Sequence, residues 1–491
     1  MDIDNDEFID FSLSQKDTAI LNSVTDWAET NTTPLKVYTP VPGFENRAIS
    51  EIEAATSKLR MFNQINFINV YKRIMADPLY KNSLFNMTST FVLGGFGFVF
   101  WIIIARLYKT ENVGIATTLI SIMSLLSCFI IMGLSSSLTR YLPKSANKNE
   151  LIITSFIIAT SGTLLASTIF LLGLPIFSPQ LTFIRSNLFY IISFTLFLIF
   201  CSWNSLVESI FMAFRAASNI LIKNIIISTL KLMLPFVLIG LGAYGIFAST
   251  ASALAAGVLV SLIVLLLKFK IRPSISLNFS LVKKTSVYSF ANYIVGFMIN
   301  MPSLVLPVII LNVISARYAA YYYVASMIQN TLLIIPFATA QALLAEGSYN
   351  EAELKKHVIK AITIILAILI PATLLIILFG NIVLQFFGKD YAAEALQFLQ
   401  LYSFSTFFTS LLLIANAVLN VQHRIKSLVI LNVLAAVVTL SLSCAFISGK
   451  LVGIGWGWIL GQAIAGLVSL YFITRSNSDI SRSFWLPSVG V

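Results

Sequence analysis

The stretch NILIKNIIISTLKLMLPFVLIGLG (219–242) decides the fold class of this protein. It is apolar over the length of about 20 residues that a helix needs to cross the hydrocarbon layer of a membrane. Comparable apolar runs cover residues 84–107, 114–138, 151–174, 187–213, 220–242, 244–267, 286–311, 319–345, 358–380, 394–420, 427–448 and 452–474. They predict an all-α polytopic membrane protein with about 12 transmembrane helices.

The composition of the chain excludes several classes of protein. The 491 residues are 57% hydrophobic and 11% charged, and the mean hydropathy is +0.88. Soluble proteins carry about 25% charged residues, so we exclude a soluble enzyme, a nucleic-acid-binding protein and a disordered chain. In a membrane protein, the net charge of +11 indicates topology and not affinity for nucleic acid.

The N-terminal segments differ from the rest of the chain. Residues 1–57 carry 11 acidic and 3 basic residues and have no apolar signal-peptide core, so we expect a disordered cytoplasmic tail. Residues 58–80 are basic and have an apolar stripe at roughly helical spacing, which predicts an amphipathic helix lying in the headgroup plane.

The positive charges orient the predicted helices. The connections on the side of the acidic tail carry 17 basic residues, Lys223 among them, against 6 on the opposite side. The positive-inside rule therefore predicts that both termini lie in the cytoplasm. We expect a multi-pass protein of the cell (plasma) membrane.

The membrane part divides into two halves of six predicted helices, 81–284 and 285–491. SLFN (83–86) opens the first half and SFAN (289–292) opens the second. Because six is an even number, the halves have parallel topology and an axis along the membrane normal relates them. Two pseudo-symmetric six-helix bundles of this kind are typical of transporters, with the substrate path between the halves.

Lys231 is the candidate binding residue with the clearest rationale. It lies midway along the fifth apolar run, where a charged side chain costs several kcal/mol unless it faces a cavity or a partner. A lysine that merely packs in the bundle is the alternative interpretation.

A polar stripe in WNSLVESIFMAFR (203–215) supplies two more candidates. Asn204, Glu208 and Arg215 lie on one face of a predicted helix, because they are spaced by four and seven residues. Glu208 could pair with Arg215 or with Lys231. The stripe either lines an aqueous path or pairs internally.

Three arginines stand at the ends of predicted spans. Arg106 and Arg140 end the first two spans and Arg317 opens the eighth. Guanidinium groups bind phosphates through two hydrogen bonds, so a cleft rimmed by these residues would suit a phosphorylated substrate. For each of these arginines, the alternative is that it anchors the end of its helix at the membrane interface.

The sequence offers no catalytic or metal-binding pattern. We find no G-x-S-x-G, no P-loop and no paired carboxylates on an outer connection. The cysteines lie far apart, and neither histidine has a partner at metal-ligand spacing. We therefore expect neither an enzyme nor a cofactor or metal.

Two regions resemble the polysaccharide flippases of the multidrug/oligosaccharidyl-lipid/polysaccharide (MOP) exporter superfamily. IIIARLYKTENVGIATTLISIMSLLSCFIIMGLSSSLTRYLP (102–143) resembles the first hairpin of that family, with its Arg-Leu pair, polar turn and Gly-Leu before Arg-Tyr. LFGNIVLQFFGKDYAAEALQFLQLYSF (378–404) and ANAVLNVQHRIKSLVILN (415–432) resemble the turn before the tenth span and the run after it. The resemblance covers roughly residues 80–475.

This resemblance implies a flippase with two bundles around a V-shaped cavity, as in MATE transporters. Such a protein would move a polyprenyl-(pyro)phosphate-linked oligosaccharide to the outer leaflet by alternating access. In relatives, cavity arginines engage the phosphates, and Arg106, Arg140 and Arg317 are the matching positions. We expect a monomer, with glycosyltransferases of the same pathway as candidate partners.

Two alternatives stay open. A multidrug exporter of the same superfamily would need a buried carboxylate for its coupling ion, and Glu208 is the one acid well inside a predicted span. A membrane-embedded glycosyltransferase or polymerase would need acidic residues on a substantial outer loop, which the sequence lacks.

Overall fold

The protein is all-helical in the computed structural model, which describes residues 78–131, 133–145, 147–271 and 279–483. Twelve helices in this part are long and apolar enough to span a membrane, as the apolar runs predict. The predicted acidic tail (1–57) lies outside the described residues, as does nearly all of the predicted amphipathic helix (58–80).

The first six spans belong to what we call the N half. It comprises α4 (Pro78–Leu107), α5 (Thr110–Ile131), α6 (Leu134–Tyr141), α7 (Lys148–Phe177), α8 (Leu188–Ala213), α9 (Ala217–Val237) and α10 (Gly242–Leu267). Within it, α4 packs on α9, α7 packs on α8, and α10 packs on both α8 and α9.

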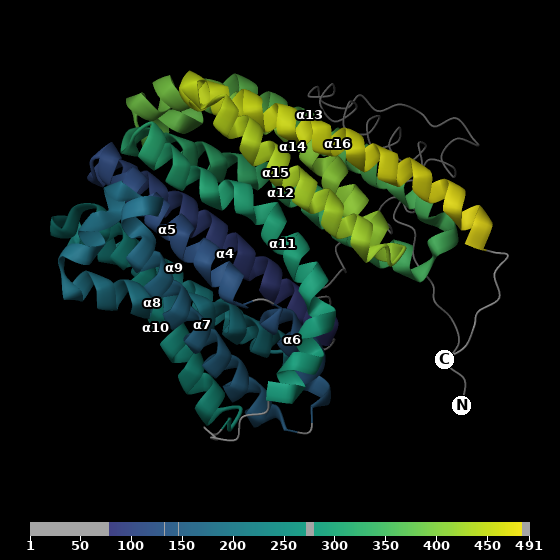
Figure 1. The fold of residues 1–491 in the computed structure, drawn as a ribbon, viewed down its shortest axis with the longest axis horizontal. Helices are drawn as coiled ribbons and strands as arrows, with labels where there is room; N and C mark the ends of the chain where they lie inside the picture. Colours follow the sequence, from purple (N-terminus) through teal and green to yellow (C-terminus); the bar gives the residue numbers. More distant parts are fainter. Residues whose placement is uncertain (1–77, 132, 146, 272–278, 484–491) are drawn as a thin grey trace, which may run out of the picture. The chain divides into compact units, whose positions relative to one another are not determined.

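The last six spans form the C half. It comprises α11 (Phe279–Val313), α12 (Ala316–Tyr349), α13 (Leu354–Phe387), α14 (Lys389–Val421), α15 (Ile425–Ala445) and α16 (Lys450–Ser483). Here α14 packs against α12, α13 and α16, while α15 packs against α16 and α11. Figure 1 shows the two halves as separate groups of helices, purple to teal and green to yellow. The predicted boundary at 284/285 falls inside α11.

The second predicted span is not one helix. The run 114–138 is divided between α5 and α6, and Gly133 lies at the break with a φ of 75°. Glycine adopts this left-handed conformation without the steric cost that other residues incur. By contrast, α4 runs unbroken through Gly94, Gly95 and Gly97, and α11 runs through Pro302 and Pro307.

A hydrophobic core joins the two halves. It runs from Trp101 of α4 through Val113 of α5 to Tyr322 of α12 and Phe398 of α14. The rings of Trp101 and Tyr323 lie 4.6 Å apart between centroids. Gly114 of α5 permits the closest approach, since a Cβ there would lie 1.7 Å from the carbonyl oxygen of Ala316.

Candidate functional site

A cavity of about 200 Å³ lies among α4, α8, α9 and α10 of the N half, and we call it the N cavity. Two of its lining residues, Glu208 and Lys231, carry charge. The lining residues are Leu93, Phe96, Gly97, Asn204, Glu208, Asn224, Ile227, Ser228, Lys231, Thr250 and Leu254. Two of the six residues singled out as site candidates therefore meet at one cavity.

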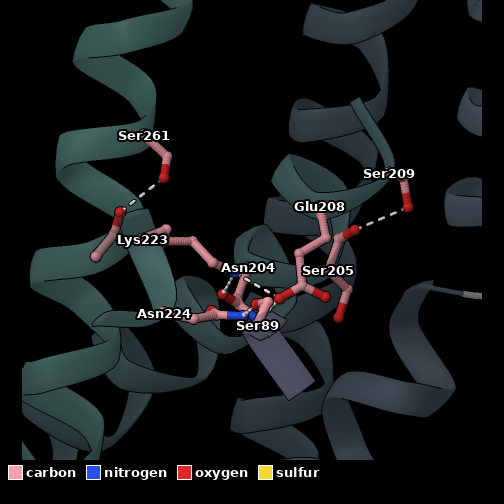
Figure 2. A network of polar contacts seen from close by, with 9 residues as sticks. Ser89, Asn204, Ser205, Glu208, Ser209, Lys223, Asn224 and Ser261 are labelled. Carbon is pink, nitrogen blue, oxygen red and sulfur yellow. Dashed lines mark hydrogen bonds and ion pairs between the residues drawn. The ribbon is translucent and has the colours of Figure 1, made fainter. Parts of the chain in front are cut away.

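Glu208 forms an ion pair with Lys223. The Nζ of Lys223 lies 2.5 Å from Oε1 of Glu208 and donates a second hydrogen bond to Oδ1 of Asn204, also at 2.5 Å. Asn204 and Glu208 are one turn apart on α8 and so share a face, and Figure 2 shows their side chains meeting that of Lys223 from α9. The side chain of Lys223 is 1% exposed and that of Glu208 is 39% exposed.

This pairing differs from the predictions made from the sequence in two respects. The partner of Glu208 is neither Arg215 nor Lys231. Lys223, which the charge pattern assigns to a connection between helices, lies inside α9 and is buried. Its position within the fifth apolar run, eight residues before Lys231, was the signal that could have placed it in the membrane.

Hydrogen bonds to α4 hold α9 in position. The side-chain amide of Asn224 donates to Oγ of Ser89 at 2.7 Å, as Figure 2 shows. The backbone N–H of Ala217 donates to Oδ1 of Asn82 at 3.0 Å, which satisfies a donor at the start of α9. These contacts fix the helix that carries both Lys223 and Lys231.

Lys231 has aromatic neighbours and no acidic one. Its Nζ lies 4.4 Å from the ring centroid of Phe100 and 5.7 Å from that of Trp101. Among the described residues, no carboxylate lies within ion-pair distance of this nitrogen. A cation over an aromatic face gains about 1 to 2 kcal/mol when desolvated. Because Glu208 balances Lys223, the ammonium of Lys231 leaves the N cavity with one excess positive charge.

Arg106 and Arg317 link the two halves at the end of the α4–α5 hairpin. Arg106 donates from Nε to the carbonyl oxygen of Phe386 at 2.9 Å and from a terminal nitrogen to that of Gln385 at 2.5 Å. It thereby caps the negative end of the α13 dipole. Arg317 lies 2.5 Å from Glu111, and its side chain is 64% exposed. Both guanidinium groups contact protein groups in this structure.

The other two arginines lie elsewhere. Arg140 ends α6, with its guanidinium 5.6 Å from the ring of Tyr141. Arg106 precedes α5 and Arg140 follows it, so a helix of 22 residues, roughly 33 Å long, separates them. Arg215 is exposed in the turn between α8 and α9, where its φ is 54°. The structure does not bring these arginines together at one cavity.

The two halves repeat each other closely over their last helices. α9 and α15 have equal lengths, and each follows a turn with a left-handed residue, Arg215 or His423. Gly242 and Lys450, the first residues of α10 and α16, form a second pair, which shares a positive φ. Both pairs are 208 positions apart, so the segments align without a gap.

A second cavity of about 100 Å³, the C cavity, occupies the equivalent place in the C half. Asn224, Thr250 and Leu254 of the N cavity correspond to Asn432, Trp458 and Gln462, which line the C cavity. The lining residues are Met298, Ile299, Asn300, Pro302, Ser303, Gln329, Asn330, Leu333, Tyr402, Thr409, Leu412, Asn432, Ala435, Ala436, Trp458 and Gln462. None of these residues carries a charge.

The described residues hold no cluster of three or more His, Cys, Asp or Glu side chains that could bind a metal ion. The elements of the site are therefore a buried ion pair, a lysine over aromatic rings, and a neutral polar cavity related to them by the repeat.

Comparisons with known proteins identify the family. The family model "Polysaccharide biosynthesis protein" matches residues 79–344. No curated protein matches the sequence. Because the family model covers more than half of the chain, it establishes membership of that family.

Several solved structures share the fold. An inward-facing MATE multidrug transporter of the MOP superfamily superimposes with a TM-score of 0.62 at 16% identity, over 78% of this chain and 94% of that one. An outward-facing MATE transporter gives 0.54 at 15% identity, over 82% and 97%. A MOP superfamily transporter from Pyrococcus furiosus, described as having a binding pocket of reverse polarity, gives 0.53 at 15% identity, over 82% and 97%. The chain is thus a multi-pass membrane protein of the polysaccharide biosynthesis protein family, with the fold of the MATE transporters of the MOP superfamily.

Proposed function

We propose that this protein is a flippase for a polyprenyl-(pyro)phosphate-linked oligosaccharide. It moves the headgroup from the cytoplasmic to the outer leaflet of the plasma membrane by alternating access. It acts as a monomer with both termini in the cytoplasm, and it receives substrate from glycosyltransferases of the same pathway. The membership in the polysaccharide biosynthesis family and the transporter fold support this class of activity.

The observation that carries the proposal is the environment of Lys231. An ionisable side chain inside a membrane protein is costly and marks a binding site or ion path. The ammonium group lies over Phe100 and Trp101, at a cavity whose one lining carboxylate, Glu208, is already paired with Lys223. The excess positive charge favours an anionic group, and the (pyro)phosphate of the polyprenyl-linked oligosaccharide is the anion that we propose it binds.

The neighbourhood of Lys231 also suits alternating access. Trp101 lies beside the ammonium of Lys231 and packs on Tyr323 of the C half. A phosphate that draws Lys231 away from these rings would change a contact between the halves. Binding of substrate is thereby coupled to the movement of one half against the other.

The test is a translocation assay with the full chain in proteoliposomes. The substrate is a fluorescent polyprenyl-pyrophosphate-linked oligosaccharide, and a membrane-impermeant glycosidase measures how much of it reaches the opposite leaflet. We expect Lys231→Ala to slow translocation about tenfold or more, the effect of losing roughly 1.4 kcal/mol of interaction. Lys231→Arg keeps the charge and should retain most of the activity.

An exposed lysine provides the matched control. Lys109, in the turn between α4 and α5, is exposed, and Lys109→Ala should translocate at the rate of the wild type. Normal translocation by Lys231→Ala, at normal amounts of folded protein, would overturn the role of Lys231. No translocation by the wild type would overturn the flippase itself.

The same proteoliposomes test the multidrug exporter as the alternative function. A pump for cationic drugs needs a carboxylate that is available to its coupling ion, and the pairing of Glu208 with Lys223 argues against that use of the N cavity. We expect no ethidium efflux from the same proteoliposomes under a proton or sodium gradient. Efflux that depends on Glu208 would favour the exporter instead.

The structure supports a role in this proposal for two of the six candidate residues. Lys231 binds the phosphate, and Glu208 neutralises the buried Lys223. Roles of Arg106, Arg140, Arg215 and Arg317 in substrate binding stay predictions, because in this structure Arg106 and Arg317 contact protein groups of the opposite half and Arg140 and Arg215 lie at helix ends.

A further inference from the structure

We propose that the C cavity is a binding subsite for the sugar part of the substrate, separate from the phosphate site at Lys231. This inference rests on the proposed function and assigns one chemical class of ligand to each half. The ligand is a neutral polyhydroxylated ring, bound by the amides of Gln329 and Asn330 and by the indole of Trp458.

The chemistry of the lining favours a sugar. Beside aliphatic side chains, four kinds of polar or aromatic group line it: side-chain amides, hydroxyls, one indole and one phenol. Amide side chains both donate and accept hydrogen bonds, as sugar hydroxyls do. Aromatic rings offer an apolar face with a polar edge, which suits the C–H face of a sugar ring. Trp458 and Tyr402 supply these rings, with centroids 4.8 Å apart.

An unsatisfied acceptor indicates that the cavity is built for a ligand. Gln329 is 1% exposed. Its side-chain nitrogen donates to Oγ1 of Thr406 at 3.0 Å, whereas its side-chain oxygen has no hydrogen-bond partner. A buried acceptor left without a partner costs about 1 to 3 kcal/mol. Because Gln329 lines the cavity, a hydroxyl of a bound sugar can supply the missing hydrogen bond.

The repeat shows how the two cavities differ. Thr250 and Leu254 of the N cavity are replaced in the C cavity by Trp458 and Gln462. The position equivalent to Lys231 is Thr439, which accepts a hydrogen bond from Gln462. Equivalent helices form the two cavities. The C cavity, however, has no charged group in its lining, and it has an indole and an amide where the N cavity has Thr250 and Leu254. Equivalent places in the two halves thus carry opposite selectivity, for a charged group and for a neutral one.

A bound cation is the competing occupant of the C cavity. Calcium and magnesium are held mainly by carboxylate oxygens, and no carboxylate lines this cavity. The amide and hydroxyl oxygens of the lining carry no negative charge to offset that of a divalent ion. The lining therefore favours a sugar over a metal ion.

The experiment compares two carriers in the proteoliposome assay: polyprenyl pyrophosphate with the full oligosaccharide and the same carrier without sugar. Gln329→Met keeps the shape of the side chain and removes the unpaired oxygen. Asn330→Ala changes an exposed side chain, so it carries little risk of misfolding. We expect each variant to slow the glycosylated carrier several-fold to tenfold and to leave the bare carrier unchanged. Lys231→Ala should slow both carriers.

Each other outcome overturns the subsite. Equal slowing of both carriers would indicate a structural role, and no slowing of either would show that the cavity does not contact the sugar. An altered sodium dependence with an unchanged ratio between the carriers would assign the cavity to a cation.

A binding measurement separates this inference from the flippase. Saturation-transfer NMR with the free oligosaccharide reports contact with the protein whether or not translocation occurs. We expect a signal from the wild type that is reduced in Gln329→Met and in Trp458→Phe. If the wild type binds the free oligosaccharide but moves no carrier, the flippase fails and the subsite stands. If the wild type gives no signal, the subsite fails.

Discussion

The N cavity and the C cavity occupy equivalent places in one repeated fold, yet one is charged and the other is neutral. At the position of Glu208, the C half has Asn416. In the N half, Glu208 pairs with Lys223 of the next helix. In the C half, Asn416 and Asn432 exchange two hydrogen bonds, of 3.0 and 2.8 Å, between α14 and α15, the equivalents of α8 and α9.

The difference shows that the repeat conserves a polar bridge between neighbouring helices and leaves its chemistry free. Lys223 corresponds to Leu431. Asn224 corresponds to Asn432, so the N half has the same amide side chain at the position that forms the bridge in the C half. An amide pair is satisfied by neutral hydrogen bonds, so it imposes no field on the cavity. An ion pair balances itself as well, but it brings a lysine into the membrane and excludes Glu208 from other cations.

The largest expected effect comes from breaking the ion pair. Glu208→Asn leaves Lys223 buried without a counter-charge, which should lower the free energy of unfolding by about 3 kcal/mol. The double substitution Glu208→Asn/Lys223→Leu copies the pattern of the C half, with Asn224, whose side-chain nitrogen donates to Oγ of Ser89, as the amide partner. It should recover most of the lost stability. Thermal melting in detergent micelles measures both variants.

The outcome tests whether an amide pair of the kind found in the C half can replace the ion pair of the N half. Equal melting temperatures for the single and the double variant would show that the amide pair depends on features that the N half lacks. A wild-type melting temperature for Glu208→Asn alone would show that the charge of Lys223 is compensated by another group.

We expect a smaller loss of stability from substitutions at a position where the two halves differ in helix packing. A Cβ at Gly461 of α16 would lie 2.4 Å from Cα of Thr439 on α15, and the equivalent residue in the N half is Ala253. Gly461→Ala should therefore destabilise the protein by about 2 kcal/mol through overpacking. Ala253→Gly is the matched change in the N half and should cost about 1 kcal/mol through helix propensity. A melting temperature of Gly461→Ala above that of Ala253→Gly would contradict the closer packing of α16.

The smallest effect is expected from the exposed ion pair. Arg317 and Glu111 are as close as Lys223 and Glu208, at 2.5 Å, but their side chains are 64% and 42% exposed. Exposed pairs contribute little, because water and salt screen them. Arg317→Gln should shift the melting temperature far less than Glu208→Asn does. A shift of equal size would mean that this contact between the halves is stronger than its exposure indicates.

The sequence correctly predicted the membrane-spanning helices and their number, because such helices need long apolar runs that are visible without a structure. It also singled out Glu208 and Lys231 for their positions within such runs. It wrongly predicted one continuous helix through Gly133, because the left-handed conformation of this glycine, which precedes α6, leaves no mark in hydropathy. Gly453, Gly457 and Gly461 are spaced by four residues, and all three approach α15 or its C-terminal end, as small residues at a helix interface do.

Hydropathy and spacing along the chain determined which segments enter the membrane, and the repeated openings of the two halves indicated how they are related. These are local properties, set by the cost of placing polar groups in hydrocarbon. Tertiary structure alone decided that Lys223, not Arg215 or Lys231, neutralises Glu208, and that Lys231 faces aromatic rings. Which charges meet depends on how α8 crosses α9 and how α4 packs on α9. No residue carries that information by itself, because the contact depends on the packing of helices that lie apart in the sequence.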